Sequence, residues 1–224
     1  IQDAPIDMVH PDMKALANIA TEPIAMVDPE KRSEVENLVM KLKKDGDSTG
    51  GIVEVVATGL PIGLGNPNFD GIENRLARVI FGVPAIKGVS FGGGFEMCAK
   101  LGSEVNDAFT MDGDKITTTT NNSGGIQGGI TNGLPLVMQV GIKPTPSIYK
   151  EQHSVSLSRK EDTLLTIQGR HDPCVALRAV PVIEAVTALV ILDFLGDIDH
   201  ELRSKTSGDS GPDGGEFSAD SLLR

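Results

Sequence analysis

The chain has 224 residues, 39% of them apolar and 23% charged, and a formal net charge of −11 at pH 7. This length suits one large domain or two small ones with a substantial core. The negative charge argues against general binding to nucleic acid or to an anionic membrane. We find no run of about 18 apolar residues that would span a membrane and no secretory leader. Two widely spaced cysteines, Cys98 and Cys174, fit a reducing compartment, which predicts a cytoplasmic protein.

The clearest predicted element is a helix over Pro29–Lys44. Asp28 is a suitable N-cap, Pro29 suits the first helical position, and Asp45-Gly46 ends the segment. Apolar residues recur at helical spacing along it. They are Val35, Leu38, Val39 and Leu42.

Alternating helices and strands follow this helix. Gly51–Ala57 is rich in β-branched residues and predicts a buried strand, and Ile86–Phe91 predicts a second strand that closes on Gly92–Gly94. Between them lies a predicted helix that ends at Pro84. Its apolar stripe consists of Ile72, Leu76, Val79 and Ile80.

The second half of the chain adds shorter predicted elements. Strands are expected over Lys115–Thr120, Pro135–Ile142 and Thr163–Gln168, with a Gly-rich turn region over Asn121–Gly133. A helix over Arg178–Phe194 is apolar on most sides, which indicates a buried helix. Strands and helices alternate without a regular βαβ series, so we predict an α+β fold. Residues 1–203 are expected to form the folded unit and residues 204–224, rich in Gly, Ser and Asp, a disordered tail.

Three segments contain the candidate site residues. In the first, Asn122–Gly129, glycines could let the backbone approach a planar or phosphorylated ligand, or could simply form two β-turns. The second, Lys143–Ser147, is stiffened by Pro144 and Pro146 and offers a cation and hydroxyls to a phosphate. Taken alone, we interpret it as a rigid turn with a solvated lysine.

The third segment, Gly169–Cys174, contains an arginine, a histidine and an aspartate before the apolar helix. The guanidinium of Arg170 suits a phosphate or carboxylate. Asp172 could cap the helix with Pro173 at its first position, or could accept a proton beside a ligand. If Lys143, Arg170 and Arg178 converge, they form a positive pocket for small anions. The sequence offers no metal-ligand spacing and no serine-hydrolase motif, so we predict no metal site.

Several motifs in order resemble the chorismate synthase family. These are GNPNFDGIENRLARVIFGVPAIKGVSFGGGFE, NNSGGIQGGITNG, KPTPS and GRHDPCVALRAVPVIEA, and they extend from about Gly59 to Leu195. The resemblance implies a lyase of the shikimate pathway, which leads to aromatic amino acids. This enzyme makes chorismate from 5-enolpyruvylshikimate 3-phosphate by 1,4-anti-elimination of phosphate, with reduced FMN as cofactor. It also implies a β-α-β sandwich of antiparallel sheets around central helices, a homotetramer, and a link to NADP; whether the enzyme reduces its own flavin stays open.

The same resemblance assigns roles to individual residues. Pro84 and Ala85 fall where the family lends backbone to the flavin, but this sequence has Pro84 where many members have another residue, which would remove one N–H donor. Gly128 matches a flavin-contacting glycine, and Arg170 an arginine at flavin and substrate. Asp172 matches an aspartate thought to be the base near flavin N5. The family's flavin-cradling loop corresponds to Lys143, Pro144, Thr145, Pro146 and Ser147.

The chain departs from the family pattern in a second respect. Family members begin with a segment that carries two catalytic histidine motifs and a stretch of the Gly-Gly-Arg-Ser-Ser-Ala-Arg type. No histidine of this chain matches either motif. We therefore expect a C-terminal portion that lacks about two-fifths of the family's length and is inactive alone. The alternative is a non-catalytic flavin-binding or assembly fragment.

Overall fold

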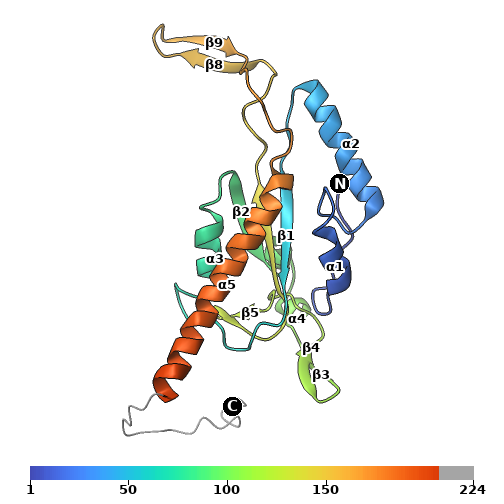
Figure 1. The fold of residues 1–224 in the computed structure, drawn as a ribbon, viewed down its shortest axis with the longest axis vertical. Coiled ribbons are helices and arrows are strands. Elements are labelled where there is room, and N and C mark those ends of the chain that lie inside the picture. Colours follow the sequence, from blue (N-terminus) through green and yellow to red (C-terminus); the bar gives the residue numbers. More distant parts are fainter. Residues whose placement is uncertain (207–224) are drawn as a thin grey trace.

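The structure is a computed structural model that describes residues 1–206, with side chains described as far as Asp197. Helices and antiparallel strands follow one another along the chain (Figure 1). The prediction of an α+β fold is therefore confirmed. In order, the elements are α1 (Met13–Ile19), α2 (Pro29–Asp45), β1 (Gly51–Ala57), α3 (Ile72–Ile80), β2 (Ile86–Phe91), the 3₁₀ helix η1 (Gly94–Ala99), α4 (Gly102–Val105), β3 (Phe109–Asp112), β4 (Lys115–Thr118), β5 (Ile126–Gln127), β6 (Ile130–Thr131), β7 (Leu136–Ile142), β8 (Gln152–Ser156), β9 (Glu161–Leu165) and α5 (Ala176–Thr206).

The main sheet has three strands in the order β1-β7-β2, all antiparallel to their neighbours. Central β7 has a strand on either side, and five of its seven residues are buried: Leu136, Val137, Met138, Val140 and Ile142. Helices α3 and α5 pack on one face of the sheet (Figure 1). The fully buried side chains there include Leu76 and Ile80 of α3, Met138 and Val140 of β7, and Ile183 of α5.

Helix α2 forms where the sequence predicts it. The Asp28 carboxylate accepts hydrogen bonds from the backbone N–H groups of Glu30 and Lys31, which satisfies the first turn. The helix ends at Gly46, whose φ of 69° is readily adopted only by a residue without a Cβ. The predicted end at Lys44 is therefore extended by one residue, to Asp45.

Strand β1 is only partly buried, which corrects the expectation of a buried strand. Val53 and Val55 pack against the core, whereas Ile52 is 72% exposed and Glu54 is also exposed. The strand is therefore half-covered, with α5 on one side.

Helix α5 differs more strongly from its prediction. It begins at Ala176 and reaches Thr206, and it buries only one side: Ile183 and Phe194 lie in the core, whereas Leu189 is 65% exposed. The segment Ala176–Asp197 is long and apolar enough to cross a membrane, which corrects our expectation that the sequence has no such run. Buried core helices meet the same criterion, and α5 packs on the sheet through Ile183.

Two hairpins extend from the body, β3–β4 at one end and β8–β9 at the other (Figure 1). Strand β9 covers Glu161–Leu165 rather than Thr163–Gln168, and its partner β8 was not predicted. Helix α1 and strand β3 were missed as well. The predicted disordered tail begins within α5, because residues 204–206 are helical; residues 207–224 lie outside the described part of the chain.

Candidate functional site

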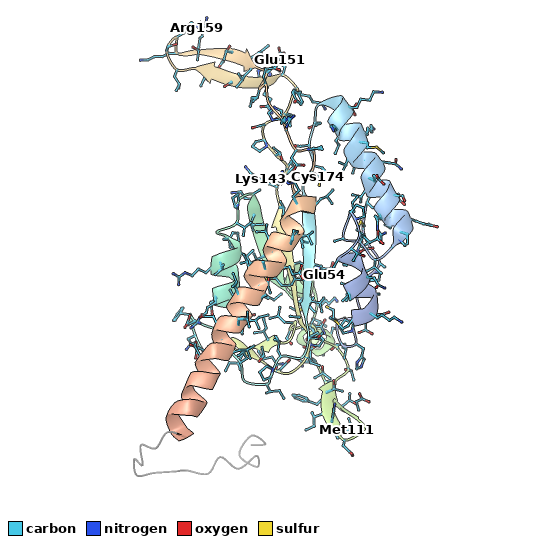
Figure 2. All side chains as sticks on the ribbon, in the orientation of Figure 1. Glu54, Met111, Lys143, Glu151, Arg159 and Cys174 are labelled. Carbon is cyan, nitrogen blue, oxygen red and sulfur yellow. The ribbon has the colours of Figure 1, made fainter. Side chains whose placement is uncertain are left out.

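Two of the predicted site segments meet at one end of the main sheet. Ser48, just before β1, donates its hydroxyl to the backbone carbonyl of Thr145 at 2.6 Å. The next residue, Thr49, donates its backbone N–H to the carbonyl of Pro173 at 2.8 Å. Figure 2 shows Lys143 and Cys174 near this same end of the sheet. One short segment therefore fixes the Lys143–Ser147 loop and the Gly169–Cys174 loop side by side.

Tyr149 links the two loops from the other side. Its hydroxyl donates to the carbonyl of Gly169, and its ring meets the His171 ring edge-on with 4.7 Å between centroids. The Nε2 atom of His171 lies 3.0 Å from the carbonyl oxygen of Ile167. His171 thus holds the shape of the loop, while the neighbouring Arg170 is exposed.

A strained backbone position lies directly beside Lys143. The N–H of Lys143 donates to the carbonyl of Ala85 at 3.0 Å, and Ala85 has a φ of 72°, unusual for a residue with a Cβ. Pro84, which precedes it, is exposed. Strain of this kind persists where the surrounding structure fixes it and is common at binding sites. Ala85 and the Lys143 loop therefore form one connected unit.

The pairing of β2 with β7 also contains a bulge at this end. Ile86 pairs with Ile142 and Gly88 with Gly141, so Lys87 is the extra residue on β2. Bulges re-aim side chains and are frequent next to functional sites. Here Lys87 and Lys143 border a shallow, open hollow of about 470 Å³ on the sheet. The other lining residues are Gly51, Ile52, Gly88, Gly141 and Ile142.

Asp172 does not cap the helix as an N-cap residue, because α5 begins only at Ala176. Its carboxylate instead accepts the N–H of Cys174 at 3.1 Å and a hydrogen bond from the Arg178 guanidinium at 3.3 Å. Arg178 is 80% exposed and Asp172 only 26%. Asp172 is therefore half-buried beside one cation, with its orientation fixed by the turn that precedes α5.

The cations of the site are only partly free to bind an anion. Arg178 is paired with Asp172, whereas Lys143 and Arg170 form no ion pair within the described residues. Lys143 borders the hollow together with Lys87, which we did not predict. The convergence of Lys143, Arg170 and Arg178 on one point stays a prediction.

Gly128 lies away from this group. It occupies the turn between β5 and β6, whereas Lys143 follows the opposite end of β7. The seven residues of β7 separate these ends by about 20 Å. A Cβ at Gly128 would meet nothing within 4 Å, so the turn is open to a ligand. Within this chain the predicted flavin residues thus form two groups at opposite ends of β7.

Asp107, which we did not single out from the sequence, holds the Gly-rich segment in place. Its carboxylate accepts hydrogen bonds from the Thr120 hydroxyl at 2.8 Å, from the Asn122 N–H at 2.7 Å, and from the Ser123 N–H and hydroxyl at 3.0 and 2.8 Å. Partial burial by itself would raise the pKa of Asp107, but the hydrogen bonds from Ser123, Thr120 and Asn122 outweigh it and lower that pKa below 3.8.

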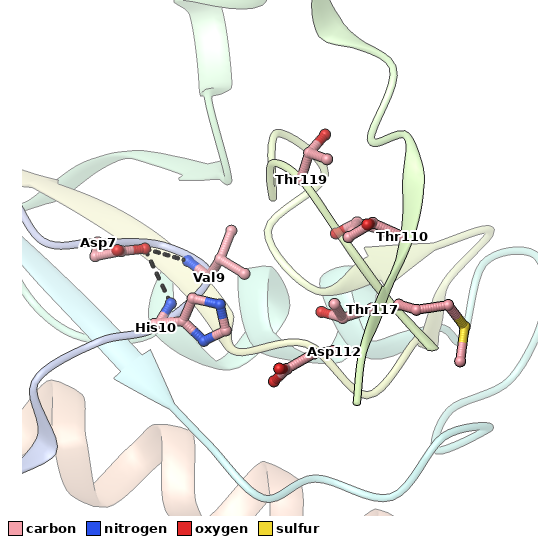
Figure 3. A pocket seen from close by; sticks show the side chains of 9 residues that line it. Asp7, Val9, His10, Thr110, Asp112, Thr117 and Thr119 are labelled. Carbon is pink, nitrogen blue, oxygen red and sulfur yellow. Dashed lines mark hydrogen bonds between the residues drawn. The ribbon is translucent and has the colours of Figure 1, made fainter. Parts of the chain in front are cut away.

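Buried Asn121 fixes the same segment from inside. Its side-chain amide donates to the carbonyls of Met8 and Pro135, and its oxygen accepts the N–H of Gly125. A second hollow of about 400 Å³ lies near the chain start, between Asp7 and His10 on one side and the β3–β4 hairpin on the other (Figure 3). None of the predicted site residues lines it.

Comparison with known proteins identifies the family. The chorismate synthase family model matches residues 4–195. The chain is 46% identical over 189 residues to the chorismate synthase of Methanosarcina mazei, covering 84% of this chain and 50% of that protein. For the chorismate synthase of Dehalococcoides mccartyi the identity is 45%, covering 83% and 50%.

A solved structure agrees with these relatives. A crystal structure of chorismate synthase superposes with a TM-score of 0.64 at 30% identity, covering 82% of this chain and 49% of that one. The chain thus spans about half the length of the relatives it matches. The motifs, the fold and these matches agree: the chain belongs to the chorismate synthase family.

Proposed function

We propose that this chain carries the FMN-cradling half of a chorismate synthase, which converts 5-enolpyruvylshikimate 3-phosphate into chorismate with reduced FMN. The family acts in the shikimate pathway. The observation that supports the proposal best is the pair of hydrogen bonds from Ser48 and Thr49, which hold two family-matching loops together. A cytoplasmic location, a homotetramer and NADP as an electron source belong to the same proposal.

The residues at this end of the sheet suit an anionic flavin. Lys87 and Lys143 provide two cations at the edge of this hollow, and its other lining residues are three glycines, Gly51, Gly88 and Gly141, and two isoleucines, Ile52 and Ile142. An apolar surface with little side-chain bulk suits a flat ring, and lysines suit a phosphate. Lys143–Ser147 and the backbone of Ala85 would hold the cofactor. When bound, reduced FMN would lend an electron transiently as the phosphate departs.

The protein's own groups would orient the substrate and take its proton. Arg170, exposed and unpaired within the described residues, would bind a substrate carboxylate or phosphate. In the reaction the C–O bond to phosphate breaks, a proton leaves carbon 6, and a new double bond remains. We assign the proton to the Asp172 carboxylate, whose orientation is fixed by Cys174 and Arg178.

A titration of the chain with FMN, followed by flavin fluorescence with and without substrate, tests the proposal. Lys143→Ala and Arg170→Ala are expected to weaken saturable binding. Lys43→Ala, at an exposed position on α2, is the matched control and should bind like the parent chain. Absence of saturable binding by the parent chain would contradict an FMN cradle on this half.

The chain alone is expected not to turn over substrate. The two acid–base histidines that the family resemblance implies are not matched by any histidine here, and each such group is worth about 10²–10⁴-fold in rate. Chorismate formed by the purified chain would contradict this expectation. The alternative is a non-catalytic assembly or flavin-binding fragment. Catalysis after addition of the missing half of a relative would exclude it.

A further inference from the structure

Arg170 lies on a stretch of backbone that has little support of its own. Within the described part of the chain, residues 167–172 belong to no helix or strand and make no backbone-to-backbone hydrogen bond. Arg170 itself is exposed. Backbone without such bonds samples many conformations unless other contacts restrict it. The position of Arg170 therefore depends on the side chains that hold this loop.

Two side chains reach the carbonyl groups of the loop. The Tyr149 hydroxyl donates to the carbonyl of Gly169, the residue before Arg170. The Nε2 atom of His171, the residue after Arg170, lies 3.0 Å from the Ile167 carbonyl oxygen, so the ring carries a proton on Nε2. The rings of Tyr149 and His171 meet edge-on with 4.7 Å between their centroids. Tyr149 therefore contacts the residue on each side of Arg170.

Tyr149 is itself held by the end of α2. Its backbone N–H donates to the carbonyl of Gly46 at 3.0 Å, and a Cβ on Gly46 would lie only 2.9 Å from the Cβ of Tyr149. The next residue, Lys150, pairs with Asp47 at 2.6 Å. The segment after β7 and the segment before α5 both run between the main sheet and the β8–β9 hairpin (Figure 1). Tyr149 joins these two segments to each other and to α2.

We propose that Tyr149 is a positioning residue for anion binding, which holds the Arg170 guanidinium beside the Lys143–Ser147 loop. Tyr149 follows that loop directly in the sequence, so one side chain ties the two anion-binding segments together. A guanidinium on fixed backbone loses less conformational entropy when it binds a phosphate or carboxylate. The inference rests on the proposed function, in which these segments bind the anionic groups of cofactor and substrate.

Titration of the full 224-residue chain with FMN, followed by flavin fluorescence, tests this role. Tyr149→Ala is expected to weaken binding about tenfold, and Tyr149→Phe, which keeps the ring, only about threefold. A double variant separates positioning from a general loss of structure. In an Arg170→Ala background Tyr149→Ala should add little, because its effect passes through that guanidinium.

A second readout does not depend on flavin. Trypsin cleaves after arginines on backbone that opens readily, so Tyr149→Ala should speed cleavage after Arg170 about threefold or more, relative to cleavage after Arg159 in the same chain. Gln152→Ala is the matched control. It removes a hydrogen bond that reaches the Pro146 carbonyl, not the Arg170 loop, and should leave this relative rate unchanged.

Circular dichroism checks that each variant is folded, and Tyr149→Phe takes the place of Tyr149→Ala in both experiments if the alanine variant is not. Tyr149 variants that bind FMN like the parent chain would overturn the proposal. So would full weakening by Tyr149→Ala in the Arg170→Ala background, or an unchanged rate of cleavage after Arg170. If the parent chain binds no FMN, the proposed function fails, and the trypsin rates alone decide whether Tyr149 holds the loop.

Discussion

The guanidinium carbon of Arg75 lies 4.2 Å from the centre of the Phe194 ring. The two residues are 119 positions apart in the sequence (194 − 75). Their contact joins α3 to the apolar helix α5. The same guanidinium donates two hydrogen bonds to Asp70, both at 2.8 Å, and one to Asp193 at 2.7 Å. Arg75 thus covers one end of the core while its charge stays paired.

Replacing Arg75 should loosen the contact between α3 and α5. Arg75→Ala removes the stacking on Phe194 and leaves Asp70 and Asp193 without their cation. We expect a loss of about 1–2 kcal/mol in the free energy of unfolding, since exposed ion pairs add little and the stacking contact somewhat more. Urea denaturation measures it. Arg78→Ala, at an exposed site on the same helix, serves as the control; equal effects of the two would contradict the role of Phe194.

Asp107→Asn should destabilise the Gly-rich segment in a pH-dependent way. The amide keeps one acceptor oxygen but turns an NH₂ group towards donors such as Ser123 and Asn122. At neutral pH we expect the free energy of unfolding to fall by about 1–2 kcal/mol.

The sign of the pH effect follows from the lowered pKa of Asp107. A carboxyl whose pKa is lower in the folded state contributes stability above its unfolded pKa, here near 3.8, and loses it as the pH falls through the folded value. The difference in the free energy of unfolding between the parent chain and Asp107→Asn should therefore narrow as the pH falls below about 3.8. Asp112→Asn, at an exposed position, is the control. A gap that stays constant into acid would show that the ionised carboxylate is not what holds the loop.

The adjacent glycines 128 and 129 should respond differently to alanine. Both have positive φ, 60° and 83°, so each substitution carries a backbone penalty of about 1–2 kcal/mol. Gly128 has free space, whereas a Cβ at Gly129 would lie 2.8 Å from the carbonyl oxygen of Asn66. We expect Gly129→Ala to lose about 2–4 kcal/mol in total. Thermal denaturation of both variants compares them, and equal melting temperatures would contradict the crowding at Gly129.

Shortening a side chain should reduce the stability of the protein much more on the buried face of α5 than on its exposed face. Ile183 is fully buried, so Ile183→Ala should cost about 2–5 kcal/mol. Leu189 is 65% exposed, so Leu189→Ala should change stability by no more than about 0.5 kcal/mol. Urea denaturation of the two variants provides the comparison. A large loss at Leu189 would mean that this face is covered when the chain is alone in solution.

Local signals in the sequence predicted the elements that depend on neighbouring residues. The limits of α2 follow from Asp28 and Gly46, and β2 appears where expected. Strand β8 was missed because Gln152–Ser156 lacks apolar alternation. Helix α5 was taken as buried on most sides because its composition does not reveal that only one sheet lies against it.

The loops of the candidate site could be predicted from the sequence, but the residues that hold these loops in place could not. The family resemblance pointed to Lys143–Ser147, Arg170 and Asp172, and hydrogen bonds hold the two loops together. Ser48 and Lys87 gave no signal, because their positions depend on contacts between segments far apart in the sequence. The separation of Gly128 from Lys143 likewise depends on the direction of β7.

The order of strands in the main sheet also determines when the core can form. Strands β1 and β2 both pair with β7, whose first residue follows the end of β2 by 45 positions (136 − 91). Pairing between such distant segments is slow, because the connecting loop must close first. At a synthesis rate of about 5–20 residues per second, β2 would wait roughly 2–9 s for its central partner, and β1, which ends 79 positions before β7 (136 − 57), roughly 4–16 s. During that interval the nascent chain exposes two apolar strands without a neighbour, so assistance from chaperones should matter most before residue 142 is made.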